Sequence, residues 1–223
     1  TNELMTKFRQ SILNDTPPQE KKHAEDFIKA NTKSVVSLYL IRKYFFANSS
    51  PDYDKALSLL ALLEKEQGKN PLFGKMKTWA TDTKNSSVGK QLPTFTAYDL
   101  NGKMVSSADL SSAPVAVIYT WASYNYDSHE LQRELKRRQK KANGRLKLMG
   151  FCLDASKYEC KQNIKRDSIT SPTICNGEMM EDKTLNKLGL KSLPNIILLQ
   201  NGKIIARGMK KQELYNKLDE LLK

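Results

Sequence analysis

Few side chains in this sequence have strong nucleophilic, redox or metal-binding chemistry: three cysteines and two histidines. Cys152, Cys160 and Cys175 are too few and too unevenly spaced for a disulfide-framework domain or a zinc site. With just His23 and His129 to add ligands, we expect no metal centre. We also expect no other cofactor.

Two of the cysteines could form a redox pair. Cys152 lies in an expected strand, and Cys175 ends a short strand that should run near it, so a disulfide between them is geometrically conceivable. Cys160 falls on an expected helix, and no two cysteines form a Cys-x-x-Cys motif. The simpler interpretation of Cys152 is a free cysteine that packs as a small hydrophobe in a central strand.

After residue 88, short runs of β-branched residues alternate along the sequence with segments that have the pattern of amphipathic helices. These elements must position the cysteines and His129. This alternation is typical of βαβ units and a largely parallel sheet. The run 114–121 is too continuously apolar for an edge strand, so we expect it at the centre. Asn-Gly-Lys turns at 101–103 and 201–203 predict two hairpins. The other expected elements are strands at 95–100, 146–153, 172–175 and 195–199, and helices at 128–141, 157–166, 183–188 and 211–222.

The first 85 residues carry helix start signals at Thr16-Pro17, Ser50-Pro51-Asp52 and Asn70-Pro71. Apolar residues between them recur at helical spacing, which indicates packing stripes and no catalytic constellation. The stripe residues are Val35, Leu38, Tyr39, Ile41, Phe45, Phe46, Leu57, Leu59, Leu60, Leu62 and Leu63. We therefore predict an α-helical domain over residues 1–85 and an α/β domain over residues 86–223.

A formal net charge of +13 raises the question of an anionic partner. The densest basic cluster, 133–147, falls mainly on one helix face without interleaved aromatic residues, which predicts a solvated face and no nucleic-acid partner. The longest apolar stretch, 35–46, is interrupted by Ser37, Arg42 and Lys43, so we expect no transmembrane segment. The opening residues do not look like a signal peptide, and we expect any targeting signal or lipid anchor to lie outside these residues.

Five short motifs occur in an informative order: VGKQLPTF at 88–95, DLNGK at 99–103, WAS at 121–123, LP at 193–194 and NGKII at 201–205. With them, residues 88–223 resemble the TlpA/ResA-type thiol-disulfide oxidoreductases, thioredoxin-like proteins of the bacterial cell envelope. The helical preface is similar to the segment before this domain in larger envelope proteins of the group. The resemblance implies a thioredoxin-like fold with a central mixed sheet flanked by helices, a cis peptide bond before Pro194, and a periplasmic or cell-envelope location.

The chain departs from that family where its chemistry should be. The resemblance places Asn125 and Ser128 at the two positions of the family's Cys-x-x-Cys motif. Disulfide exchange needs a thiolate, and an amide cannot attack a disulfide, so we expect no catalytic residue at either position. Ser128 has no neighbouring base except His129, which as the next residue on a helix should point elsewhere. Asp127 or Ser128 is interpreted as the helix N-cap, and Asp154 or Ser156 as the cap of the next helix.

The expected function is therefore binding. We expect a peptide or protein partner in the envelope to occupy a shallow groove between the helix start and the cis-proline loop. Two alternatives stay open: thiol-disulfide exchange through Cys152 and Cys175, and a structural role in which the helical domain docks a partner. The oligomeric state stays open as well. The residues expected to line the groove are Trp121, Tyr124, Asn125, Tyr126, Asp127, Leu193 and Pro194.

Overall fold

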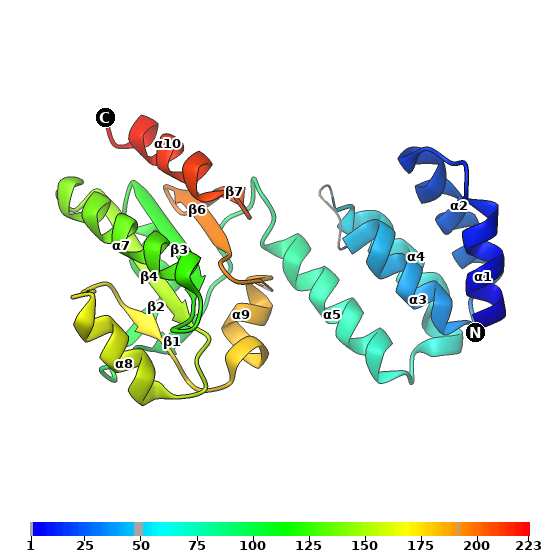
Figure 1. Ribbon diagram of the computed structural model, residues 1–223, viewed down its shortest axis with the longest axis horizontal. Coiled ribbons are helices and arrows are strands. Elements are labelled where there is room, and N and C mark those ends of the chain that lie inside the picture. The colour runs from blue at the N-terminus through cyan, green and yellow to red at the C-terminus, as the bar shows by residue number, and fades with distance from the viewer. Residues whose placement is uncertain (1, 47–50, 191) are drawn as a thin grey trace. The chain divides into compact units, whose positions relative to one another are not determined.

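The chain forms two compact units, Thr1–Lys84 and Asn85–Lys223 (Figure 1). The division falls within one residue of the boundary expected from the change in composition. The computed structural model describes residues 2–46, 51–190 and 192–223. Within these residues, no helix is long and apolar enough to cross a membrane.

The first unit is helical, and polar caps begin its helices. The Thr16 N–H donates to Gln19 Oε1 at 2.9 Å, and Asp52 and Asn70 accept N–H groups in the first turns of the following helices. Ser50, part of one expected start signal, lies outside the described residues. The elements are α1 (Asn2–Ser11), α2 (Pro17–Ala30), α3 (Val35–Ile41), the π-helical turn η1 (Arg42–Phe46), α4 (Tyr53–Gln67) and α5 (Pro71–Asn85).

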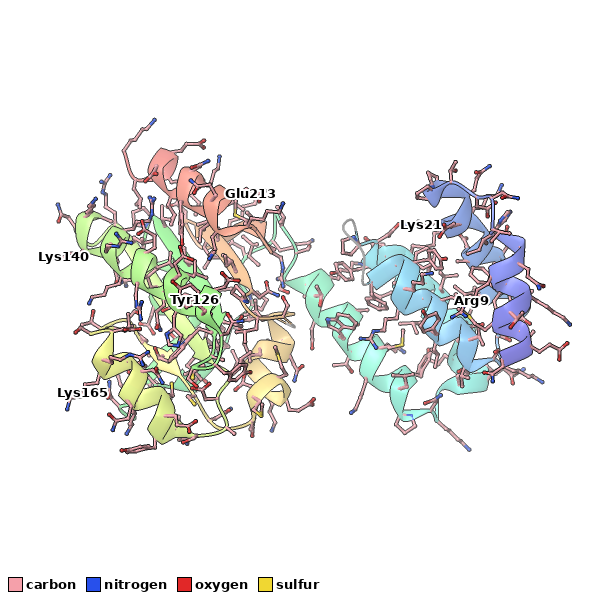
Figure 2. The ribbon with its side chains drawn as sticks, viewed as in Figure 1. Arg9, Lys21, Tyr126, Lys140, Lys165 and Glu213 are labelled. Atoms are coloured by element: carbon pink, nitrogen blue, oxygen red, sulfur yellow. The ribbon has the colours of Figure 1, made fainter. Side chains whose placement is uncertain are left out.

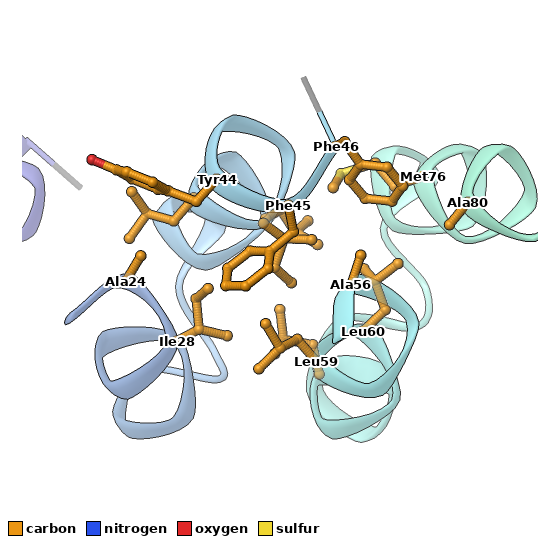
Figure 3. Packing of buried hydrophobic residues seen from close by; sticks show 14 of the residues in the cluster. Ala24, Ile28, Tyr44, Phe45, Phe46, Ala56, Leu59, Leu60, Met76 and Ala80 are labelled. Carbon is orange, nitrogen blue, oxygen red and sulfur yellow. The ribbon is translucent and has the colours of Figure 1, made fainter. Parts of the chain in front are cut away.

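The apolar stripes of these helices converge on one core (Figure 3). Leu59, Leu60 and Leu63 of α4 are buried together with Ile28 of α2 and Phe45 of η1. The predicted stripes are therefore packing surfaces. They are narrower than expected, because three of their members lie outside the buried arc of their helices and are exposed: Val35, Tyr39 and Leu62.

The second unit is built on a five-stranded mixed sheet in the order β5-β4-β3-β6-β7. Strand β3 is central and fully buried, as expected from its continuous apolar run; β4 and β5 run parallel to it, and β6 antiparallel. A separate antiparallel pair, β1 (Thr96–Tyr98) and β2 (Met104–Ser106), forms the first hairpin. The strands of the main sheet are β3 (Val115–Trp121), β4 (Leu146–Cys152), β5 (Thr173–Ile174), β6 (Ile196–Gln200) and β7 (Lys203–Arg207).

Helices cover both faces of this sheet. One core joins the sheet to α6 and α9, and the other joins it to α7, α8 and α10. Alternation along β3 decides which side chain enters which core: Ile118 faces the first, and Tyr119 and Trp121 face the second. The helices are α6 (Ser107–Ser111), α7 (Tyr126–Lys141), α8 (Lys157–Arg166), the 3₁₀ turn η2 (Met179–Glu181), α9 (Lys183–Lys187) and α10 (Lys211–Leu221).

A pair of leucines on α4 tests the packing of the helical unit. Leu60 is fully buried, whereas Leu62, two residues on, is half exposed. We expect Leu60→Ala to lower the free energy of unfolding by about 2–5 kcal/mol, because it removes buried methyl groups and leaves a cavity. Leu62→Ala should change it by less than about 0.5 kcal/mol. Urea unfolding followed by circular dichroism compares the two, and equal losses would contradict the assigned core.

Candidate functional site

The site expected from sequence lies where β3 passes into α7. Asn125 is the N-cap of α7, and its side-chain oxygen accepts the Ser128 N–H at 2.8 Å. The expectation that Asp127 or Ser128 caps the helix is wrong. The chain turns into the helix earlier than its polar residues suggested, so that Tyr126 already lies in the first turn. The Asn125 amide thus stabilises the first turn of the helix.

Ser128, which caps no helix in the structure, is fully buried. Its hydroxyl donates to the Asn125 carbonyl at 2.8 Å and accepts the Ala122 N–H at 3.2 Å. Both bonds lie within the β3–α7 connection, so the hydroxyl satisfies backbone groups that would otherwise be buried without partners. The Ser128 hydroxyl therefore stabilises the β3–α7 connection, and both of its hydrogen-bonding functions are used by the backbone.

His129 does not assist Ser128. Its Nε2 lies 3.0 Å from the Ser123 carbonyl oxygen, its Nδ1 lies 3.4 Å from Asp167 Oδ2, and its ring packs edge-on against Trp121. Arg133, one turn further along α7, lies 3.2 Å from Asp167 Oδ1. Burial alone would raise the pKa of the Asp167 carboxyl, but the hydrogen bond and charge of Arg133, together with the charge of Arg166, hold that pKa below its usual range.

Asp154 is buried beside the same connection. Its Oδ1 accepts the Ser123 N–H at 2.8 Å, while Oδ2 has no hydrogen-bond partner among the described residues. Of the two caps considered for α8, Ser156 is the one observed, because its hydroxyl accepts the Glu159 N–H. Asp154 therefore orients the loop that precedes α7 and does not cap α8.

The loop before β6 lies at the same end of the sheet, and its Leu193-Pro194 peptide bond is cis, as the resemblance implied. Thr120 anchors it: its hydroxyl donates to the Ser192 carbonyl at 2.9 Å and accepts the Asn195 N–H at 2.7 Å. The backbone N–H and carbonyl of Leu193 make no hydrogen bond to any residue that the structure describes. An extended segment could pair with these two groups.

Two tyrosines stand out from the helix start. Tyr124 is 68% exposed and Tyr126 is 78% exposed, and Figure 2 shows Tyr126 at the beginning of α7. Asp127 is exposed beside them, and Lys211 of α10 binds its Oδ1 at 2.8 Å. This hydrogen bond, with that to Glu130, raises the pKa of Lys211. Lys211 is shared between the carboxylates of Asp127 and Glu130, so the surface next to the tyrosines retains a net negative charge.

One expected lining residue needs correction. Trp121 is fully buried, because alternation along β3 turns its side chain into the core that α7, α8 and α10 cover. Its ring packs against His129 in the first turns of α7, and its side chain has no exposed surface for a ligand to contact. Leu193 and Pro194 are half-buried, as is Asn125. The exposed part of the expected lining is Tyr124, Tyr126 and Asp127.

The three cysteines converge, although no short motif links them. Their Sγ atoms all lie within 4.8 Å of one another, and all three thiols are free and buried. Hydrogen bonds from the Cys152 and Cys160 thiols lower the pKa of Cys175, while hydrogen bonding to its two neighbours raises the pKa of Cys152. The sequence placed Cys152 near Cys175 but left Cys160 apart. The i, i+4 spacing of the apolar residues Cys160 and Ile164 on α8 was the signal that could have placed Cys160 on the inner face of that helix.

No protein-family model matches the chain, and no curated protein matches it significantly. Solved structures do. A thiol-disulfide oxidoreductase from Bacteroides fragilis is 28% identical with a TM-score of 0.53, and the match covers 60% of this chain and 100% of that one. The C-terminal domain of a candidate thiol-disulfide oxidoreductase from Bacteroides thetaiotaomicron is 26% identical with a TM-score of 0.54, over 62% of this chain and 97% of that one.

A longer match includes the helical region. A thioredoxin-like protein from Bacteroides caccae is 13% identical with a TM-score of 0.59, and the match covers 90% of this chain and 77% of that one. At this identity the likeness concerns the fold alone. The chain thus has a thioredoxin-like mixed sheet flanked by helices and preceded by a helical region, and its second unit is similar at low identity to the thioredoxin domains of thiol-disulfide oxidoreductases.

The cap at Asn125 makes a measurable prediction. Asn125→Ala removes the side-chain acceptor for the Ser128 N–H and should lower the free energy of unfolding by about 1 kcal/mol. Asn125→Asp keeps an acceptor at the cap and should stay within a few tenths of the wild type. Chemical denaturation of the three proteins gives the comparison. A loss in the aspartate variant as large as in the alanine variant would show that the cap is not the cause.

The Asp167 contact predicts a dependence on pH. A carboxyl whose pKa is lowered on folding stabilises the protein above its unfolded pKa of about 3.9, and this stabilisation is lost as the pH falls through the folded pKa. Asp167→Asn should therefore destabilise at pH 7 and much less at the lowest pH where the protein stays folded. The control is Asp219→Asn on α10, which breaks an ion pair with Arg138, a residue of α7 like Arg133. Because the Asp219 carboxyl is exposed, the loss in the free energy of unfolding should be less than about 1 kcal/mol. A pH-independent loss in Asp167→Asn would exclude the charge as its origin.

Proposed function

We propose that this chain is a thioredoxin-like protein of the bacterial cell envelope that binds extended peptides or unfolded protein segments and does not exchange disulfides at the start of α7. The binding surface comprises Tyr124 and Tyr126 together with the backbone of Leu193 beside the cis-proline. The observation that carries the proposal is the backbone of Leu193, which makes no hydrogen bond to any described residue although Thr120 anchors the loop on both sides of it, at Ser192 and Asn195.

The absence of exchange chemistry follows from the two side chains at the start of α7. Exchange requires an accessible thiolate and a second sulfur to resolve the mixed disulfide. Asn125 supplies an amide that caps the helix, and Ser128 supplies a buried hydroxyl that is bonded to backbone. Both groups stabilise the helix start, and neither can form a bond to sulfur under physiological conditions.

Peptide binding is supported by the kinds of groups available. A peptide that pairs with the Leu193 N–H and carbonyl would add a short strand-like segment, in which backbone hydrogen bonds supply affinity without demanding a particular sequence. Tyr124 and Tyr126 supply large, rigid and amphipathic contact area at low cost in conformational entropy. Because Lys211 pairs with both Asp127 and Glu130, one negative charge remains beside the tyrosines, which disfavours strongly acidic segments.

The two alternatives have less support. Exchange through Cys152 and Cys175 requires a partner disulfide to reach sulfurs that are buried in residues only 6% exposed. Docking through the helical unit lacks a defined surface, because the exposed apolar side chains of that unit, including Leu13, Leu62 and Leu72, lie on three different helices or their ends. The envelope location rests on the family resemblance, and cell fractionation with the full-length gene product tests it.

An insulin-reduction assay tests the lost chemistry. Wild-type protein should show no turnover above background, while the variant Asn125→Cys with Ser128→Cys should gain activity, because it restores the sulfur spacing at a helix start. The added variant Cys152→Ala with Cys175→Ala separates the alternative enzyme. Wild-type turnover that disappears in this variant would establish exchange through the buried pair and refute the proposal.

Binding is tested with a permanently unfolded probe, carboxymethylated α-lactalbumin, titrated into isotope-labelled full-length protein. Amide shifts should concentrate at residues 123–127 and 193–195. Tyr124→Ala with Tyr126→Ala should weaken binding at least about tenfold, since rigid aromatic anchors dominate such contacts. The matched control is Tyr98→Ala on β1, because Tyr98 is 69% exposed, as Tyr124 is, but belongs to the other sheet. Shifts confined to residues 2–84, or no binding at all, would contradict the proposal.

A further inference from the structure

The three buried cysteines come from three separate elements. Cys152 is the last residue of β4, Cys160 lies in the first half of α8, and Cys175 directly follows β5. Their Sγ atoms all lie within 4.8 Å of one another. Neither the proposed peptide surface nor the helix start makes use of this cluster.

The sheet itself brings two of the sulfurs together. Parallel pairing aligns Gly150 with Thr173 and Phe151 with Ile174, so the next step of the same register sets Cys152 beside Cys175. The helix α8 connects the two strands and packs its inner face on the same core, which turns Cys160 toward them. The three thiols are thus held by strands and a helix, and rigid elements of this kind preorganise a ligand set better than loops do.

We propose that Cys152, Cys160 and Cys175 bind a soft monovalent metal ion, Cu(I), through three thiolates. Thiolate ligands select Cu(I), zinc and iron–sulfur clusters among biological metals. Structural zinc sites almost always have four ligands, and iron–sulfur clusters are typically held by four cysteines. In the part of the chain that the structure describes, no histidine, aspartate or glutamate joins the three sulfurs as a fourth ligand. A three-sulfur donor set therefore favours the ion that accepts trigonal coordination.

The dimensions agree with this assignment. Metal–sulfur bonds of about 2.3 Å place the sulfurs of a planar three-coordinate site about 4.0 Å apart. The observed upper limit of 4.8 Å is closed by side-chain shifts of less than about 1 Å, which leave the backbone of the strands in place. In the metal-free protein the Cys175 thiol donates to the Asp154 carbonyl oxygen at 3.5 Å, a bond that is given up when the thiolate binds the ion. Lys157 adds positive charge near Cys175, which offsets part of the negative charge that a three-thiolate Cu(I) site retains.

An ion can reach the cluster from the end of the sheet. Cys152 and Cys175 each retain 6% exposure, and the chain becomes exposed at Ala155 and at Asn176 shortly after them. Cys160 is fully enclosed below. The site is therefore shielded from bulk water but lies one layer beneath the surface, which suits transfer of the ion from a small-molecule carrier or a partner protein.

The test uses the full-length, fully reduced protein under anaerobic conditions, with Cu(I) supplied as its complex with bathocuproine disulfonate. We expect the protein to withdraw one equivalent of Cu(I) from the chelator, with X-ray absorption showing three sulfur neighbours. Cys160→Ser should reduce the Cu(I) affinity by more than about 100-fold, beyond the usual effect of changing an outer-shell partner. The triple variant with serine at all three positions should abolish binding.

The control is Ile164→Val, which trims the same inner face of α8 one turn after Cys160 and should leave the affinity unchanged. Thermal unfolding of each metal-free variant shows whether it is folded, and if the serine variants are not, the sulfur count in the wild type decides alone. Three results would overturn the proposal: no Cu(I) withdrawn from the chelator, binding retained in the triple variant, or Zn(II) binding as tightly as Cu(I) with four-coordinate geometry.

Discussion

The parallel pairing of β3 with β4 is the constraint on which the rest of the second unit depends. Its register sets Trp121 opposite Cys152, so the chain leaves both strands at the same edge of the sheet. The Leu153 N–H then bonds the Trp121 carbonyl at 2.8 Å, and the Ser123 N–H bonds Asp154. Because β6 runs antiparallel to β3, its first residues meet the end of β3 at this edge as well, where Asn195 bonds Thr120. The helix start, the Asp154 loop and the cis-proline loop therefore meet because of the strand directions.

The same edge holds two different kinds of chemistry at two depths. At the surface, Tyr124 and Tyr126 are exposed, and the backbone of Leu193 makes no hydrogen bond to any residue that the structure describes. Beneath it, on the core face of β4, the three thiols face one another. The positions where the resemblance implies reactive sulfur carry an amide and a hydroxyl that serve the local backbone. The three cysteines of this chain lie instead at the end of β4, on α8 and directly after β5.

The helix α7 shows how an apparently solvated face takes part in tertiary structure. Its basic residues were expected to face water. Figure 2 shows Lys140 near the C-terminal end of α7, and Glu213 marks the neighbouring helix α10. Two of them are paired across elements: Arg133 with the buried Asp167 after α8, and Arg138 with Asp219 of α10. Arg138 also lies over the Tyr215 ring. The pairing orients α7 against its neighbours, which helps to hold the capped helix start where β3 ends.

The sequence by itself determined most of the elements of the second unit and their order, because hydrophobic periodicity and turn residues are local signals; the short helix α6 and the turn η2 were not predicted. Helix α8 has the predicted bounds, and both Asn-Gly-Lys turns close hairpins. Only the tertiary structure decided which of several adjacent polar residues caps α7, since the cap depends on where the chain leaves β3. It also decided that Trp121 is buried, because that depends on which sheet face receives helices. Cys160 lies next to Cys152 and Cys175 because of the register of β4 with β5 and the rotation of α8 about its axis. The spacing of the cysteines along the chain encodes neither.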